Sequence, residues 1–323
     1  MNKIVVLYET EKRHQDLLQE AVRRAGSDAE ILFRRPDTVT TEELSEAEII
    51  IGNMPPKRLA ETKNLKWMQL NSAGADPFIK SGLLKEDVLL TNASGAYGLA
   101  ISEYLLAVLL YLMKNIALYE AAGREHFWRP SEKVKSIYAS KVLVIGLGDI
   151  GQEFAKKMDM LGAIVTGIRR NVAEVPSYLK GGLYTMDSLN ELLAEADVVV
   201  VTLPGTAKTK KLFDAAHFAC MKEGSLFLNI GRGSIVDSDA LADALNSGHL
   251  AGAAVDVTDP EPLPAEHRLW DARNILITPH VSGGWTLPET FERMVRISAD
   301  NLERYLSGQP LRNLINHQDG TRK

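Results

Sequence analysis

The sequence predicts an α/β fold with two doubly wound parallel-sheet domains. Short apolar runs alternate with polar helical stretches along most of the 323 residues, as expected when helices cover both faces of parallel sheets. Near the middle of the chain, one of these runs leads directly into a glycine-rich loop, which is where a dinucleotide-binding fold would begin. The length also favours two hydrophobic cores over one.

Four apolar runs in the first part of the chain predict a parallel sheet, and we expect the domain that contains it to be flavodoxin-like. They are Ile4–Leu7, Glu30–Phe33, Ile49–Ile51 and Leu65–Leu70. Glycine and proline at residues 52–56 and 73–77 predict turns after the third and fourth runs. In a parallel sheet such turns would share one edge.

A helix is expected from Leu99 to Leu118, because Ile101, Leu105 and Leu109 have helical spacing. Most residues between them are also apolar, so several faces of this helix need to be covered, and we expect it to cross between the domains. Its longest apolar stretch, Tyr104–Met113, is about half as long as a membrane span requires.

Six further apolar runs predict a complete dinucleotide-binding sheet. They are Val142–Ile145, Ile164–Ile168, Val198–Leu203, Leu226–Ile230, Ala253–Val257 and Ile275–Thr278. An amphipathic stretch, Leu287–Leu306, follows them and is expected to return to the first domain. The expected domains are therefore residues 1–97 with 286–323, for substrate binding, and residues 98–285, for the dinucleotide.

Composition narrows the class of protein. The net charge of −5 argues against a surface built for nucleic acid or for an anionic membrane. Cys220 is the only cysteine, and Met1–Lys12 has too short an apolar run for a secretory signal, so a cytoplasmic location is expected. None of the seven histidines is followed by another four residues later on a helix, and no metal site is expected.

The loop Gly146-Leu-Gly148-Asp149-Ile150-Gly151 follows a predicted strand and precedes a predicted helix. In this context the first glycine permits a tight turn, the second lets the backbone approach a pyrophosphate, and the third allows close packing of helix and strand. The alternative is a glycine-rich turn without a ligand. The flanking strand and helix favour dinucleotide binding.

Three polar residues follow later strands of the same predicted sheet: Arg232, Glu261 and His280. Because carboxyl ends of parallel strands line the ligand crevice, these side chains are expected to converge. Singly, each has a simpler reading as a solvated arginine, a glutamate in a proline-rich loop, or a loop histidine. Together they suit reduction of a carbonyl: histidine gives the proton, glutamate orients the imidazolium, and arginine binds a carboxylate.

At this point the chain resembles the D-isomer-specific 2-hydroxyacid dehydrogenase family over nearly its whole length. The resemblance is carried by residues 187–229 and by Arg232-Gly-Ser-Ile-Val-Asp237. Ser102-Glu103-Tyr104 stands where such families often have a histidine, which is similar to the glyoxylate and hydroxypyruvate reductase branch. Formate dehydrogenase is expected to have a glutamine in place of Glu261.

The resemblance implies roles for individual residues. Arg232 would bind the substrate carboxylate and carbonyl, His280 would be the acid and base supported by Glu261, and Asp256 would face the nicotinamide. Backbone N–H groups around Ala73 and Gly74 would bind the substrate carboxylate from the other domain, unless this loop is an ordinary turn. Further cofactor contacts are expected at Leu203, Pro204, Thr209, Ile230 and Gly231.

The cofactor is expected to be NADP(H) in preference to NAD(H). An acidic residue about 20 positions beyond the glycine loop usually binds the ribose 2′-hydroxyl of NAD. Here Arg169 and Arg170 stand at that place, and two guanidinium groups suit a 2′-phosphate. If the arginines only solvate the strand end, the site would accept both cofactors.

Two questions stay open at the level of sequence. The main alternative to an enzyme is a nicotinamide-sensing corepressor of the same fold, and the identity of the 2-oxo acid is undetermined. A homodimer is expected from the apolar stretch Tyr104–Met113 with Phe127, Trp128 and Ile137. On the first domain, Asn53 and Met54 are candidates for contact with the substrate side chain or for a simple turn.

Overall fold

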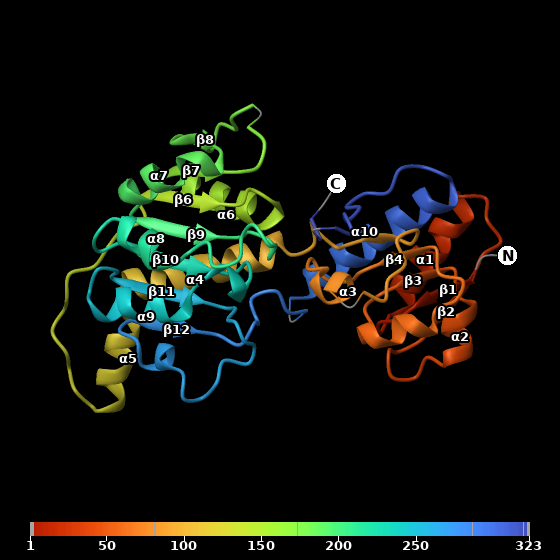
Figure 1. Ribbon diagram of the computed structural model, residues 1–323, viewed down its shortest axis with the longest axis horizontal. Helices are drawn as coiled ribbons and strands as arrows, with labels where there is room; N and C mark the ends of the chain where they lie inside the picture. The colour runs from red at the N-terminus through yellow and green to blue at the C-terminus, as the bar shows by residue number, and fades with distance from the viewer. Residues whose placement is uncertain (1–2, 81, 173, 286, 319, 322–323) are drawn as a thin grey trace. The chain divides into compact units, whose positions relative to one another are not determined.

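The computed structural model describes residues 3–80, 82–172, 174–285, 287–318 and 320–321. The chain divides into two compact units, Met1–Tyr97 with Trp285–Lys323, and Gly98–Gly284. Each unit contains one parallel sheet, which confirms the predicted α/β class with two doubly wound sheets (Figure 1). Position 286, where the substrate domain was expected to resume, lies outside the described residues.

The first unit is built on a parallel sheet of order β2-β1-β3-β4-β5, which is the flavodoxin-like order. Its strands are β1 (Lys3–Val6), β2 (Glu30–Phe33), β3 (Ile49–Ile51), β4 (Trp67–Gln69) and β5 (Leu89–Thr91). Its helices are α1 (Lys12–Arg24), α2 (Thr41–Glu46), the 3-10 helix η1 (Pro56–Glu61), α3 (Asp76–Lys80) and α10 (Pro288–Leu306). Among the strands of this first sheet, β5 is the one that the sequence did not predict.

Helix α10 belongs to the first unit although it follows the whole second unit in sequence. It packs against α1 (Figure 1), and Tyr305 near its end stacks on the fully buried Trp67 with ring centroids 5.1 Å apart. Its buried residues include Met294, Val295 and Leu302, so its apolar face closes one side of this core.

The second unit contains a seven-stranded parallel sheet of order β12-β11-β10-β9-β6-β7-β8. The strands are β6 (Lys141–Ile145), β7 (Ile164–Ile168), β8 (Gly182–Tyr184), β9 (Val198–Val201), β10 (Leu226–Asn229), β11 (Gly252–Val255) and β12 (Ile275–Ile277). This is the dinucleotide-binding order with one strand added at the β12 edge. The unpredicted strand is β8, a short edge strand.

The helices of the second unit cover both faces of its sheet. They are α4 (Gly98–Met113), α5 (Ile116–Arg124), α6 (Asp149–Met160), α7 (Leu189–Glu195), α8 (Ala215–Cys220) and α9 (Ser238–Asn246), with 3-10 helices η2 (Met186–Ser188), η3 (Gly233–Ile235) and η4 (Arg268–Asp271). The core under α8 and α9 includes Phe213, Phe218 and Phe227, whose rings lie 4.9 to 5.8 Å apart.

The prediction of one helix from Leu99 to Leu118 is wrong. Helix α4 ends at Met113, and Asn115 adopts a left-handed conformation with φ of 54° before α5 begins. The two helices meet at an angle of 68°. Among the described residues, no single helix is both long and apolar enough to cross a membrane, and α4 and α5 reach that length only as this bent pair.

Candidate functional site

The glycine loop connects β6 to α6 and has the geometry expected for a dinucleotide. Gly146 has φ of +102°, which favours glycine, and a Cβ on Gly151 would lie 2.0 Å from the Gly146 carbonyl oxygen. At Gly148, by contrast, a Cβ would meet nothing within 4 Å. The outer glycines are therefore required by packing, whereas Gly148 borders open space at the helix N-terminus, where a phosphate can approach.

Two neighbours in this loop have different surroundings. Ile150 is half-buried in the first turn of α6. Asp149 stays a predicted cofactor contact, and in the structure its Oδ2 accepts a hydrogen bond of 2.8 Å from the backbone N–H of Gly98, the first residue of α4. Asp149 thus connects the N-termini of α4 and α6.

Arg169 and Arg170 directly follow β7, the neighbour of β6 in the sheet. The backbone N–H of Arg169 donates to the Tyr184 carbonyl at 3.0 Å, which fixes the main chain there. Both side chains are exposed, and neither guanidinium forms a hydrogen bond or ion pair with a described residue. Two charged forks are therefore available to an anion beside the glycine loop.

The loops after β9 and β10 lie against each other. A Cβ on Gly231 would be 2.5 Å from the Leu203 carbonyl oxygen, so only glycine allows this approach. The β9 loop is held by Thr209, whose hydroxyl donates to the Pro204 carbonyl at 2.8 Å. Ile230 is buried next to Gly231. All five residues predicted for the cofactor-side loops therefore lie at one edge of the sheet.

Arg232 follows directly in the β10 loop. Its Nη1 donates to the Gly231 carbonyl at 2.7 Å, and its own carbonyl accepts from the Asn229 side-chain amide at 3.0 Å. At the next position a Cβ on Gly233 would lie 1.9 Å from the Thr258 carbonyl oxygen. Glycine at 233 therefore brings the Arg232 loop into contact with the loop that follows β11.

That β11 loop carries Glu261, and the structure brings it to His280. His280 Nδ1 lies 3.0 Å from Glu261 Oε2, and Glu261 Oε1 accepts from the Thr258 N–H at 3.1 Å. Both side chains are half exposed. Because the carboxylate takes Nδ1, the other ring nitrogen, Nε2, is left for a substrate. The pair matches an acid held in orientation by a carboxylate.

Asp256 directly follows β11, and its side chain binds the loop after β12 that carries His280. Its carboxylate is 1% exposed; Oδ1 accepts from the Thr278 hydroxyl at 2.6 Å and the Val281 N–H at 2.9 Å, and Oδ2 accepts from the Ser282 N–H at 3.0 Å. Its own carbonyl accepts from the His280 N–H at 2.8 Å. The carboxylate therefore binds the chain on both sides of His280, whose φ is +53°.

Tyr104 of α4 extends this network, and sequence reasoning missed both it and Thr278. The Tyr104 and Thr278 hydroxyl oxygens lie 2.5 Å apart. Burial raises the pKa of the Tyr104 phenol, and the Asp256 charge acts in the same direction. Since Thr278 donates to Asp256, Tyr104 donates to Thr278. The one available signal was the stretch Ser102-Glu103-Tyr104, where the family that the sequence resembles often has a histidine.

Ala73 and Gly74 lie in the first unit, between β4 and α3. Both are partly exposed, and their N–H groups form no hydrogen bond with a described residue. Asn53, predicted as a candidate for contact with the substrate side chain or for a simple turn, binds this loop with its side-chain amide: Oδ1 accepts from the Asn71 N–H at 3.1 Å and Nδ2 donates to Ser72 Oγ at 3.0 Å. Met54 is buried in the core.

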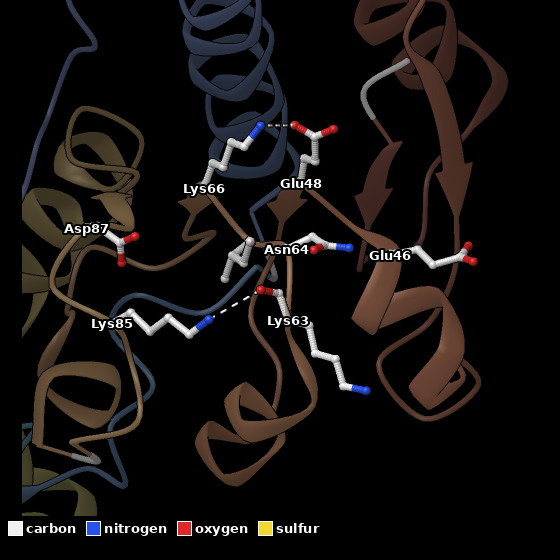
Figure 2. Close-up of a pocket in the computed structure, with 8 residues that line it drawn as sticks. Glu46, Glu48, Lys63, Asn64, Lys66, Lys85 and Asp87 are labelled. Atoms are coloured by element: carbon white, nitrogen blue, oxygen red, sulfur yellow. Dashed lines mark hydrogen bonds and ion pairs between the residues drawn. The ribbon is translucent and has the colours of Figure 1, made fainter.

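A polar cavity of the first unit lies elsewhere, at the opposite edge of the sheet from the Ala73 loop. It has a volume of about 360 Å³ and lies where β3, β4 and β5 begin. Figure 2 shows Lys66 reaching Glu48 and Lys85 reaching the Lys63 carbonyl across it. Lys66 and Glu48 thus form an ion pair in its lining. Across the described residues, no three histidine, cysteine, aspartate or glutamate side chains gather as a metal site would require.

Comparison with known proteins agrees with this geometry. Residues 106–282 match the family model of the D-isomer-specific 2-hydroxyacid dehydrogenase NAD-binding domain. Glyoxylate/hydroxypyruvate reductase B of Pectobacterium carotovorum is 29% identical over 284 residues, which cover 85% of this chain and 87% of that protein. The chain spans only about half the length of several phosphoglycerate dehydrogenases that it also matches, covering 54% of the Methanocaldococcus jannaschii protein.

Two solved structures resemble the whole chain. A D-isomer-specific 2-hydroxyacid dehydrogenase family protein from Aeromonas salmonicida is 31% identical, with a TM-score of 0.83 and coverage of 98% of this chain and 99% of that one. A D-isomer-specific 2-hydroxyacid dehydrogenase from Xanthobacter autotrophicus, in complex with NADPH and MES, is 28% identical, with a TM-score of 0.79 and the same coverage.

Proposed function

Since this chain belongs to the family of D-isomer-specific 2-hydroxyacid dehydrogenases, we propose that it reduces a small 2-oxo acid to its D-2-hydroxy acid with NADP(H). The observation that carries the proposal is the 3.0 Å contact between His280 Nδ1 and Glu261 Oε2, next to the arginine loop of the same sheet. The relative from Pectobacterium, a glyoxylate/hydroxypyruvate reductase, indicates the size of the substrate.

Three side chains would divide the work on the substrate. Reduced nicotinamide, when bound, would supply the hydride. His280 Nε2 would donate a proton to the carbonyl oxygen as negative charge develops there. Glu261 would stabilise the imidazolium and fix its ring, and Arg232 would bind the carboxylate through its guanidinium. The same carboxylate would be received by the N–H groups of Ala73 and Gly74.

A substrate panel tests this proposal. Oxidation of NADPH, followed by its absorbance, is measured with glyoxylate, hydroxypyruvate and larger 2-oxo acids. His280→Ala and Arg232→Ala should each lower kcat/KM by roughly a hundredfold or more and leave NADPH binding intact. The control His317→Ala, outside the site, should change neither kcat/KM nor NADPH binding. A protein that binds NADPH but reduces none of these acids would support a sensor in place of an enzyme.

The preference for NADP(H) rests on the guanidinium groups of Arg169 and Arg170 beside the glycine loop, which are exposed and have no partner among the described residues, and the Xanthobacter relative was solved with NADPH. A charge-assisted hydrogen bond to a phosphate is worth roughly 1.5–3 kcal/mol. Arg169→Ser should therefore lower kcat/KM for NADPH about 10- to 100-fold and that for NADH much less. Equal losses with the two cofactors, or a wild-type preference for NADH, would contradict the assignment.

We also propose that the protein is a homodimer, associating through its dinucleotide-binding unit. Trp128 is 93% exposed and Phe127 55%, which is unusual for large apolar side chains. Ile137, by contrast, is buried, so the proposed dimer rests on the exposed side chains of Phe127 and Trp128. Sedimentation should give a dimeric mass for the wild type and a monomeric one for Trp128→Glu. A location in the cytoplasm stays a prediction, to be checked by cell fractionation.

A further inference from the structure

In the loop that carries Ala73 and Gly74, the backbone carbonyls accept hydrogen bonds, whereas the N–H groups of these two residues donate none to a described residue. Four consecutive carbonyls, from Asn71 to Gly74, each accept a hydrogen bond. The donors are Tyr97 Oη to Asn71, the Ala93 N–H to Ser72 at 2.9 Å, Asn92 Nδ2 to Ala73 at 2.6 Å, and Ser72 Oγ to Gly74 at 2.7 Å. The N–H groups of Ala73 and Gly74 have no partner among the described residues.

Asn53 controls this arrangement from the turn after β3. Its Oδ1 accepts from the Asn71 N–H and its Nδ2 donates to Ser72 Oγ. Because the Ser72 oxygen receives that hydrogen bond, its own proton is directed to the Gly74 carbonyl, 2.7 Å away. The Asn53 side-chain amide therefore holds the loop on both sides of Ala73: it binds Asn71 directly, and it holds Gly74 through the hydroxyl of Ser72.

We propose that Asn53 is a positioning residue, which keeps the N–H groups of Ala73 and Gly74 directed at an incoming carboxylate. This inference rests on the proposed function and names how the first unit contributes to it. With all four carbonyls already accepting hydrogen bonds, the N–H groups of Ala73 and Gly74 remain unused donors among the described residues, and successive N–H groups in a turn can form a concave site for an anion. The Asn53 amide has both of its ends engaged, so its effect on a substrate is indirect.

The test compares Asn53→Ala with the matched control Asn64→Ala. Asn64 is exposed in the same unit, and it lines the cavity at the opposite edge of the sheet (Figure 2). Asn53→Ala should raise KM for the best 2-oxo acid about tenfold, as expected for the loss of hydrogen bonds that fix the loop. The kcat should stay within about threefold of the wild-type value and the Kd for NADPH should not change. Asn64→Ala should match the wild type throughout.

Two further measurements separate positioning from a general loss of stability. The Kd for oxalate, a carboxylate without a reducible carbonyl, should rise by a factor similar to that for KM. Hydrogen exchange should become faster at the Asn71 N–H, which donates to Asn53 in the wild type, and stay unchanged in the peptides of β1 and α1. A fall in kcat at unchanged KM, or faster exchange throughout the unit, would overturn the role of Asn53.

Failure of the proposed function can be recognised separately. If the wild type reduces no 2-oxo acid, that function fails, and the oxalate measurement alone then decides about Asn53. Oxalate binding that is weakened in Asn53→Ala would support the inference even then. Wild-type protein that binds no oxalate, or an Asn53→Ala variant that binds it as tightly as the wild type, would overturn it.

Discussion

Replacing Asp256 with asparagine tests whether this buried carboxylate controls the position of His280. Asparagine has the same shape, so the packing around the side chain is kept. With its oxygen in the place of Oδ1, it can still accept from Thr278 and from the Val281 N–H. Its nitrogen would then face the Ser282 N–H, which is 3.0 Å from Oδ2 in the wild type, and two donors would oppose each other.

The size of the effect follows from these three hydrogen bonds. A hydrogen bond to a charged group contributes roughly 1.5–3 kcal/mol and one between neutral groups about 1 kcal/mol. Losing the bond to Ser282 and weakening the other two should cost about 3–5 kcal/mol in total. If about half of this acts on the orientation of His280, kcat/KM should fall about 10- to 100-fold.

The assay is steady-state reduction of the best 2-oxo acid at saturating NADPH, with the Kd for NADPH measured separately by fluorescence. Urea unfolding reports the part of the cost that appears as lost stability. Asp271→Asn, at an exposed aspartate of the same unit, is the control. An Asp256→Asn variant with kcat/KM within threefold of the wild type would refute the reasoning. A loss confined to NADPH binding would instead indicate the nicotinamide contact implied by the family resemblance.

Three other predictions follow from the described contacts. Tyr104→Phe removes one hydroxyl from the Asp256 network and should lower kcat about three- to tenfold without changing the Kd for NADPH; an unaltered kcat would exclude the tyrosine from the network. Gly148→Ala should unfold like the wild type but bind NADPH much more weakly, whereas Gly151→Ala, with its Cβ 2.0 Å from a carbonyl oxygen, should be strongly destabilised; equal stabilities would contradict the packing argument. A hydrogen bond from Lys211 and another from the N-terminus of α9 hold the pKa of Asp237 below its ordinary value. The charged carboxylate therefore stabilises the folded protein at any pH above the pKa that Asp237 has in the unfolded chain. This stabilisation is lost as the pH falls through the lower pKa that Asp237 has in the folded protein. Asp237→Ala should therefore reduce the unfolding free energy by about 0.5–2 kcal/mol at pH 7 and by less at pH 3, and an unchanged difference at the two pH values would contradict it.

The sequence was sufficient for those parts of the site that depend on the order of strands. His280 and Glu261 are 19 positions apart, yet each follows a run with the composition of a buried strand. In a parallel sheet this alone brings them to one edge, and the structure places the two side chains 3.0 Å apart. The glycine loop was predictable for a similar reason, since its three glycines have different packing demands at fixed spacing.

Contacts between distant polar groups could not be predicted in the same way. Nothing near Asn53 in the sequence indicates that its amide binds residues 71 and 72, because these lie 18 and 19 positions away in another loop. The bend after α4 was hidden by continuous helical spacing of apolar residues, although Lys114 and Asn115 interrupt the apolar run. Strand β8 has one buried residue in three, too little for a recognisable period.

The order of the strands also sets the direction in which the cofactor should lie. Neighbouring parallel strands are about 4.8 Å apart. Arg169 follows β7, which is the neighbour of β6 on one side, so it lies one strand from the glycine loop. Arg232 follows β10, which is two strands from β6 on the other side, or about 10 Å from the glycine loop. The loops after β11 and β12, with Glu261 and His280, continue in the second direction. A dinucleotide with its pyrophosphate at the glycine loop can therefore place its 2′-phosphate at Arg169 only if its nicotinamide points towards β10–β12. If Arg169 binds the phosphate as proposed, the same strand order would bring the nicotinamide to the side of the sheet where His280 is proposed to donate its proton.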